Sequence, residues 1–369
     1  MKRYFILSIG LFLVLFSFNS CKEDIELVGD FKETAVIYGL LDQSDSTHII
    51  KINRAFIGPG NAVEIAKIPD SSYFSSVNAS ITEYVDQIKT GRSWILKDTL
   101  VDNKSTNGVF YAPTEKLYYF KDSLNELATY KLDIIIYKGS PKEFKVTGET
   151  EMVHGIISGQ KQFSSSFDFV TSDNKMNSAS AKIAVSNTGN ASVINASLKI
   201  NFNEYQGVNL CNSVNFNWNA GESTVSPNSN YNASLDGSLF YELIKKNVTS
   251  NTSITNRKLK SITIIITGGS EEFNNYINAN KPSSSLAQSK PIYTNLKVNN
   301  GNSVVGIFSS RQTVTIVKQF SYIGVNQNPS CLSSNSRKEL CTGNISKHTS
   351  DLLFCSDHNL DANQLYHCQ

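Results

Sequence analysis

The 369-residue sequence has almost no net charge, because 34 Lys and Arg side chains face 32 Asp and Glu side chains. Lys2 and Arg3 lie in a leader that we expect to be removed, which leaves equal numbers of basic and acidic side chains. A domain that binds nucleic acid by neutralising phosphates gathers a surplus of Lys and Arg on one face. The sequence supplies no such surplus, and we therefore exclude nucleic-acid binding.

The common catalytic and nucleotide-binding motifs are also missing. The sequence has no G-x-S-x-G, H-E-x-x-H, G-x-x-x-x-G-K-[ST] or G-x-G-x-x-G pattern. Glu149 and Glu151 point the same way on one expected strand, as the carboxylates of a glycosidase could, but solvated sheet faces produce such pairs constantly. We assign no catalytic residue, cofactor or metal, and we predict that the protein is not an enzyme. A hydrolase without a recognisable motif is the less favoured alternative.

Long hydrophobic runs are absent, since the apolar run from Tyr4 to Phe16 is shorter than the about 20 residues that span a membrane. This run follows Lys2 and Arg3 and precedes small or polar residues, which is the layout of a secretory signal peptide. It stops at Ser20 and Cys21, and this arrangement resembles the lipobox of bacterial lipoproteins. We expect removal of residues 1–20 and lipidation of Cys21. An ordinary signal peptide with an incidental cysteine is the alternative.

A short charged sequence, Lys22-Glu23-Asp24, follows the cysteine. It resembles the signal of a Lys and two acidic residues that sends flavobacterial lipoproteins to the outer face of the outer membrane. The alternative is a plain polar tether, which is common at lipoprotein N-termini. We expect residues 21–30 to form a tether and the protein to be anchored by lipid to the outer membrane and exposed at the cell surface.

The rest of the chain has the pattern of a mainly β protein. From residue 31 to about 155, apolar and polar residues alternate in short runs, as in Tyr130, Leu132, Ile134 and Ile136, and turn residues separate the runs. About seven or eight such runs are typical of a β-sandwich. We predict an N-terminal sandwich over 31–155.

Beyond residue 155 the chain becomes rich in Asn and Ser, and further strands are expected, including runs at 303–309 and 312–323. Three short helices interrupt them: one capped by Asp236 or Ser238, one capped by Ser270, and one that starts at Ser334 or Ser336. We predict a second β-rich domain over 156–330 and a Cys-rich segment over 331–369. The fold class is thus mainly β, with two sandwich-like domains of immunoglobulin or transthyretin type in series.

Four stretches together resemble a known family. They are Thr34–Asp42, His48–Gly58, Pro69–Phe74, and Ile292–Leu296 leading to Gly306–Phe308. They are similar to an uncharacterised family of Bacteroidetes outer-membrane lipoproteins, a domain of unknown function often encoded beside TonB-dependent receptors. The resemblance implies a β-sandwich lipoprotein that is accessory to a transporter, and it implies no reaction and no functional residue.

From the leader and this resemblance we expect a non-enzymatic lipoprotein that helps a TonB-dependent receptor to capture or admit a substrate. Its partners would be the membrane, through the lipid, and the receptor. A structural or adhesive surface module is the main alternative.

The cysteines and histidines near the C-terminus leave two alternatives open. Exported proteins meet oxidising conditions, so we expect two disulfides among Cys211, Cys331, Cys341, Cys355 and Cys368, with one thiol left over. Zinc held by Cys355, His358, His367 and Cys368 is the alternative, but the adjacent His367 and Cys368 cannot easily both turn inward.

Aromatic side chains make up 10% of the chain, and several stand close together in sequence. Trp94, Trp218, Phe110-Tyr111 and the run Tyr118–Phe120 could offer flat faces to a sugar or a peptide. The default interpretation is that alternate members of each run fill the core.

Overall fold

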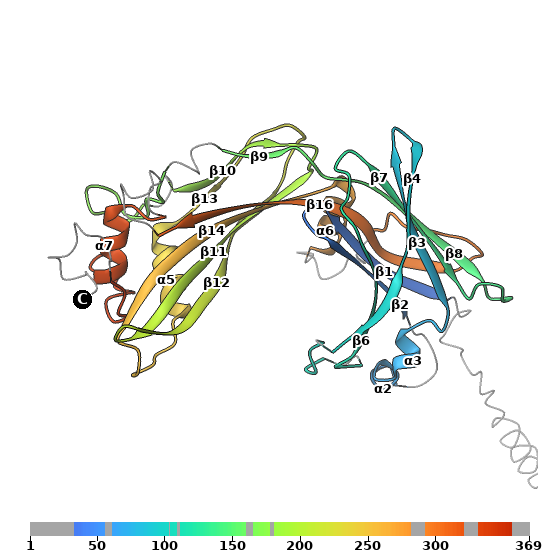
Figure 1. Ribbon diagram of the computed structural model, residues 1–369, viewed down its shortest axis with the longest axis horizontal. Helices are drawn as coiled ribbons and strands as arrows, with labels where there is room; N and C mark the ends of the chain where they lie inside the picture. Colours follow the sequence, from blue (N-terminus) through green and yellow to red (C-terminus); the bar gives the residue numbers. More distant parts are fainter. Residues whose placement is uncertain are drawn as a thin grey trace, which may run out of the picture.

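The computed structural model describes residues 33–55, 61–102, 104–108, 111–159, 165–177, 181–281, 292–320 and 331–355. Figure 1 shows two lobes, joined by one long strand, β16, that runs from one lobe into the other. Strands dominate both lobes and the helices are few and short. The prediction of a mainly β, sandwich-like fold with a few short helices is confirmed.

One eight-stranded sheet extends through both lobes. In order across the sheet it consists of β12 (Asn209–Thr224), β11 (Val193–Gln206), β14 (Asn256–Gly269), β16 (Ser303–Gln319), β1 (Thr34–Asp42), β2 (Thr47–Ala55), β6 (Glu115–Lys121) and β5 (Lys97–Val101).

Two smaller sheets lie against it, one in each lobe. The first has five strands: β15 (Lys297–Val298), β8 (Phe144–Glu151), β7 (Thr129–Ile136), β3 (Val77–Val85) and β4 (Ile88–Ile95). The second has three: β13 (Tyr231–Ser234), β10 (Lys182–Thr188) and β9 (Ile156–Ser158). Two short helices, α2 (Ala62–Ala66) and α3 (Pro69–Ser72), follow β2.

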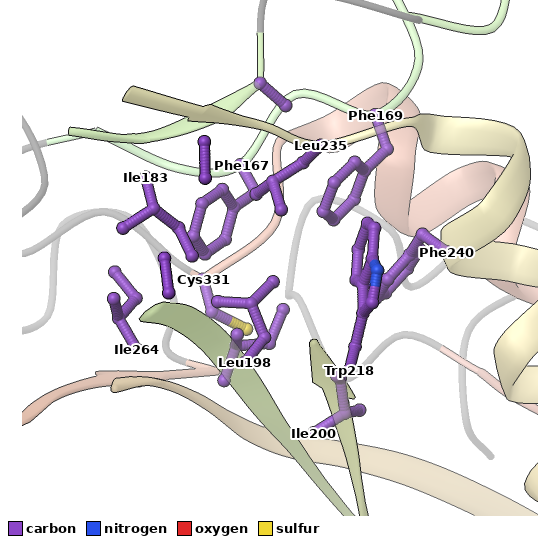
Figure 2. Close-up of a cluster of buried hydrophobic side chains, with 14 of the residues drawn as sticks. Phe167, Phe169, Ile183, Leu198, Ile200, Trp218, Leu235, Phe240, Ile264 and Cys331 are labelled. Carbon is purple, nitrogen blue, oxygen red and sulfur yellow. The ribbon is translucent and has the colours of Figure 1, made fainter. Parts of the chain in front are cut away.

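Each lobe has its own hydrophobic core. The first core gathers residues of β1, β3 and β7, such as Ile37, Ile81 and Ile134, all fully buried. The second gathers residues of β11 and β14, such as Leu198 and Ile264, with aromatic side chains above them (Figure 2). Alternating apolar residues form these strands because every second side chain then enters a core.

The strand β16 departs from the prediction of two separate strands. Its first part, Ser303–Arg311, pairs in parallel with β1. Its second part, Arg311–Gln319, pairs in antiparallel orientation with Ser261–Gly269 of β14. The predicted break falls at residues 310–311, yet Ser309 and Ser310 are fully buried in the strand. The strand therefore serves both lobes. Leu296 and Phe308, which the sequence places in the second domain, pack in the first core. The division into domains in series stays a prediction.

The three expected helices are present. Helix α5 (Gly237–Asn247) is capped by Asp236, α6 (Glu271–Asn280) by Ser270, and α7 (Ser334–Thr342) by Ser333, one residue before the predicted start. Each capping side chain accepts a hydrogen bond from a backbone N–H of the first turn. Helix α7 ends at Gly343 in the left-handed conformation.

The prediction of two disulfides is wrong. Cys211, Cys331 and Cys341 carry thiols, which leaves at most one bridge among the five candidates. Cys355 is disulfide-bonded, and Cys368 lies outside the described residues. Cys331 is fully buried, and Figure 2 shows its sulfur beside Leu198 in the second core. A buried cysteine of this kind acts as a small hydrophobic side chain.

Packing holds the described part of the C-terminal segment, residues 331–355, in place. Leu332, Leu340, Leu352 and Phe354 all belong to the second core. We predicted that disulfides occur in this Cys-rich segment, whereas these four side chains bury apolar surface that orders its described part.

A buried ion pair fastens the same segment to the sheet. The Nε of Arg257, in β14, lies 2.8 Å from Oε1 of Glu204, in β11, and the two residues are 3% and 7% exposed. Arg257 also donates from Nη1 to the carbonyl of Leu352 at 2.7 Å and from Nη2 to the carbonyl of Thr249 at 3.1 Å. Asn212 donates to the second carboxylate oxygen of Glu204. Each nitrogen of the Arg257 guanidinium and each oxygen of the Glu204 carboxylate therefore has a hydrogen-bond partner.

Candidate functional site

One face of the eight-stranded sheet carries both cores, and the opposite face, which we call the open face, is the candidate contact surface. Successive side chains of a strand point to opposite faces. In β16, Phe308 and Ile316 enter the first and the second core, whereas Thr315 and Val317 on the other side are exposed. Both smaller sheets thus lie on the same side of the large one.

In the second lobe the open face consists mainly of amide and hydroxyl side chains. It comprises Asn215, Asn217 and Asn219 of β12; Asn195, Ser197, Lys199, Asn201 and Asn203 of β11; Thr263, Ile265 and Thr267 of β14; and Thr313, Thr315 and Val317 of β16. Lys199 is charged, and the register also places Glu222 opposite Asn195 and Lys258 opposite Asn203 on this face. All of these side chains are half-buried or exposed. Such a surface offers donors and acceptors to neutral polar groups.

The strand register lines these side chains up in rows across the sheet. Asn219, Ser197, Ile265 and Thr315 form one row on four neighbouring strands. Asn195 Nδ2 donates to Asn219 Oδ1 at 3.2 Å across the β11 and β12 strands. Cross-strand pairs of this kind stabilise a sheet and hold its side chains in place.

Helix α6 covers the middle of the open face. Ser270, its capping residue, bonds Ser309 of β16 between hydroxyl oxygens at 2.7 Å. Tyr276 Oη donates to Tyr38 Oη of β1 at 3.3 Å, and their rings meet edge to face. Burial, followed by the hydrogen bond to Tyr38, raises the pKa of Tyr276 to about 12. The Tyr276 phenol is therefore neutral over the physiological range.

Polar contacts fix the lobes to each other where β16 leaves the first lobe. Asp42, almost fully buried, accepts hydrogen bonds from Arg311 Nε at 3.0 Å and Thr313 Oγ1 at 2.7 Å. Burial alone would raise the pKa of Asp42, but bonds from Ser44, Thr313 and Arg311 outweigh it and lower the pKa. The carboxylate is thus charged at neutral pH, and it ties β1 to β16.

A second joint connects the end of β8 with the turn before β11. Asn190 Oδ1 accepts from the backbone N–H of His154 at 2.8 Å, and Asn190 Nδ2 donates to the Met152 carbonyl at 3.0 Å. Ser310 Oγ donates to the Glu151 carbonyl and accepts from Val153 N–H. Because both joints are made of buried or half-buried hydrogen bonds, we infer that the lobes move as one body.

A pocket of about 200 Å³ opens at this joint. Asp86, Glu126, Glu151 and His154 are among its lining residues, so its charge is negative. Among the described residues, no three His, Cys, Asp or Glu side chains are arranged to hold a metal ion.

The carboxylate pair of the sequence analysis is divided between two pockets. Glu149 lies in a pocket of about 300 Å³ and its Oε2 is 3.4 Å from Lys131 Nζ. Glu151 lies in the pocket at the joint. The two carboxylates therefore do not face one common site, as the pair of a glycosidase does.

The aromatic candidates are mainly core residues. Trp218, Tyr118 and Phe120 are at most 8% exposed. Trp94 is half-buried, with its ring 5.1 Å from that of Phe120, and its Nε1 donates to Asp122 Oδ2 at 2.8 Å. Tyr119 and Tyr111 are half-buried, and Phe110 lies outside the described residues. None of the described rings forms an exposed stacking platform.

Several predicted site residues lie outside the part of the chain that the structure describes. They are Cys21, Lys22, Glu23, Asp24, His358, His367 and Cys368. The zinc alternative is therefore untested. No described helix has the length and apolar character needed to cross a membrane.

No family model matches the sequence, and no curated protein matches it.

The open face and the joint between the lobes were not predicted from the sequence. Asn, Ser and Thr at most of the alternate positions of β11 and β12 were a signal for a polar sheet face. The Asp42 and Arg311 pair had no comparable signal, because the two residues are far apart in the chain.

Proposed function

We propose that this protein is a non-enzymatic lipoprotein of the outer membrane, exposed at the cell surface, that assists a TonB-dependent receptor in the capture or uptake of a substrate. Lipid on Cys21 anchors it, and Lys22, Glu23 and Asp24 direct it to the surface. The two lobes then stand outside the membrane on a short tether.

The order of residues around Cys21 is the observation that carries this proposal. A basic start, an apolar run and a small residue precede the cysteine, and a charged, polar stretch follows it. Lipid attached to one cysteine converts a soluble domain into an anchored one, especially where two or more acyl chains are added.

The open face supports a binding role. In the second lobe it is broad and polar, its amides and hydroxyls outnumber the charges of Lys199, Glu222 and Lys258, and hydrogen bonds at the joints connect the two lobes. A rigid surface loses little conformational freedom when it binds a partner.

A structural or adhesive module would have the same anchor but no receptor. Extraction of the outer membrane in mild detergent, followed by affinity purification of the full chain, separates the two. The transport role predicts that a barrel receptor co-purifies in stoichiometric amount, and its absence favours the adhesive role.

The substitution Cys21→Ala should move the protein from the detergent phase to the aqueous phase in detergent phase partitioning. The reason is that the diacylglycerol has no other attachment site. Cys211→Ala, which removes an exposed thiol, is the matched control and should stay in the detergent phase. A Cys21→Ala variant that still partitions with detergent contradicts the anchor.

Neutralising the three charges with Lys22→Gln, Glu23→Gln and Asp24→Asn should leave the lipid in place and remove the protein from the cell surface. Protease shaving of intact cells measures the exposed fraction. As a control, Asp173→Asn with Lys175→Gln neutralises an exposed ion pair on the folded body and should leave digestion unchanged. Equal digestion of the wild type and the triple variant rules out this export signal.

A further inference from the structure

Strand β12 forms an edge of the eight-stranded sheet, and it differs from every other edge strand described. It has 16 residues, pairs on one side with β11, and has no described strand on its other side. It contains no Lys, Arg or Pro, and Glu222 is its single charge. Natural edge strands are usually protected by shortness, charge or proline, since their free backbone groups recruit other strands.

The other edges are protected in these ways. Strands β13, β9 and β15 have four, three and two residues. Strand β5 has five residues, including Lys97 and Asp98, and β4 carries Lys89 and Arg92. Strand β12 has two bulges, which also protect an edge, but the eight residues between them, Asn212–Asn219, have no charge, no proline and no bulge. This stretch is the part of the edge that is open to pairing with another strand.

We propose that β12 pairs with β12 of a second copy of this chain, in antiparallel orientation, about a twofold axis at Asn215. A twofold axis requires only one self-complementary surface. Two bulges, near Cys211 and Ala220, interrupt the pairing with β11 and leave Asn212–Asn219 as the regular stretch. Asn215 lies near its middle and points to the open face.

Side chains of like chemistry meet in this arrangement. On the open face Asn215 lies opposite the second Asn215, and Ser213 lies opposite Asn217. On the core face Val214 lies opposite Phe216. Asn to Asn bonding across strands already occurs within the chain, between Asn195 and Asn219. No charged residue falls within the paired stretch, so no like charges oppose one another. The two open faces join into one continuous surface.

Cysteine cross-linking in the outer membrane tests this dimer with the full chain. In a Cys211→Ser background, Asn215→Cys should give a covalent dimer with a short bismaleimide, because the two thiols face each other at the axis. The control Ser223→Cys places an equally exposed thiol on the same strand, about 50 Å from its counterpart at about 3.4 Å per residue. It should give no dimer. Equal cross-linking of the two variants, or none for Asn215→Cys, overturns the proposal.

A charge variant gives an independent readout. Asn215→Lys sets two ammonium groups against each other at the axis, and the mass of the detergent-solubilised full chain should fall from two copies to one. Ser223→Lys should leave the mass at two copies. A wild-type chain that sediments as a single copy contradicts the pairing, and the lipid anchor and receptor role are unaffected by that result.

Discussion

Gly306→Ala should destabilise the protein by about 3–5 kcal/mol, at the upper end of what single substitutions cost. Gly306 has φ of +105° in the middle of β16, and an added Cβ would collide with the carbonyl oxygen of Ile37 on the paired strand β1. Neither backbone can retreat, because both strands contribute buried side chains to the first core. The parallel pairing of β1 with β16 should therefore be lost.

The two tryptophans allow each lobe to be followed separately in urea. Trp94 packs against the first core, and Trp218 lies in the second. Single-tryptophan versions of Gly306→Ala should show a lower midpoint for both transitions, because β16 belongs to both lobes. Gly301→Ala, also at positive φ but with no atom within 4 Å of the new Cβ, should cost only about 1 kcal/mol. A shift of the Trp94 transition alone means that the lobes unfold independently.

Arg257→Met should have the second largest effect, a loss of about 3–5 kcal/mol, because it leaves the Glu204 carboxylate buried without its partner. The same change removes two hydrogen bonds that hold the carbonyls of Leu352 and Thr249. The urea midpoint of the Trp218 transition should fall, and residues 331–355 should become sensitive to limited proteolysis. Reductant alone should not release this segment, since packing holds it.

The double variant Glu204→Leu with Arg257→Met should recover most of the loss, because it leaves no unpaired charge in the core. Lys245→Ala removes an exposed ion pair with Asp351 and should change neither the transition nor the proteolysis. If the double variant is as unstable as Arg257→Met, the cost lies in lost packing and the account of the ion pair is wrong.

Features that depend on neighbouring residues could be predicted from the sequence. Tyr130, Leu132, Ile134 and Ile136 alternate with polar residues, and all four are fully buried in β7. Asp236 caps its helix as predicted, because a cap is decided within one turn. On that helix Phe240 and Tyr241 are buried, whereas Leu239 is 39% exposed, and this choice of face depends on the neighbouring strands.

Features that depend on distant residues could not be predicted. We predicted that a strand ends at Ser309, yet pairing with β1 and hydrogen bonds to Ser270 and Glu151 allow Ser309 and Ser310 to be buried within one continuous strand. Counting cysteines led us to predict two disulfides. The count could not show that Cys331 is buried in the second core, because this burial depends on Leu198 and its neighbours, which are distant in the sequence. The open face could not be predicted for the same reason, because only the order of the strands in the sheet places its amide side chains side by side.

Mass spectrometry of the N-terminal peptide from purified membranes shows whether lipid on Cys21 anchors this protein. We expect a peptide that begins at Cys21 and carries the mass of a diacylglycerol group on the sulfur. A peptide in which Ser20 and Cys21 are still joined, or a mature chain with an unmodified Cys21, would contradict it.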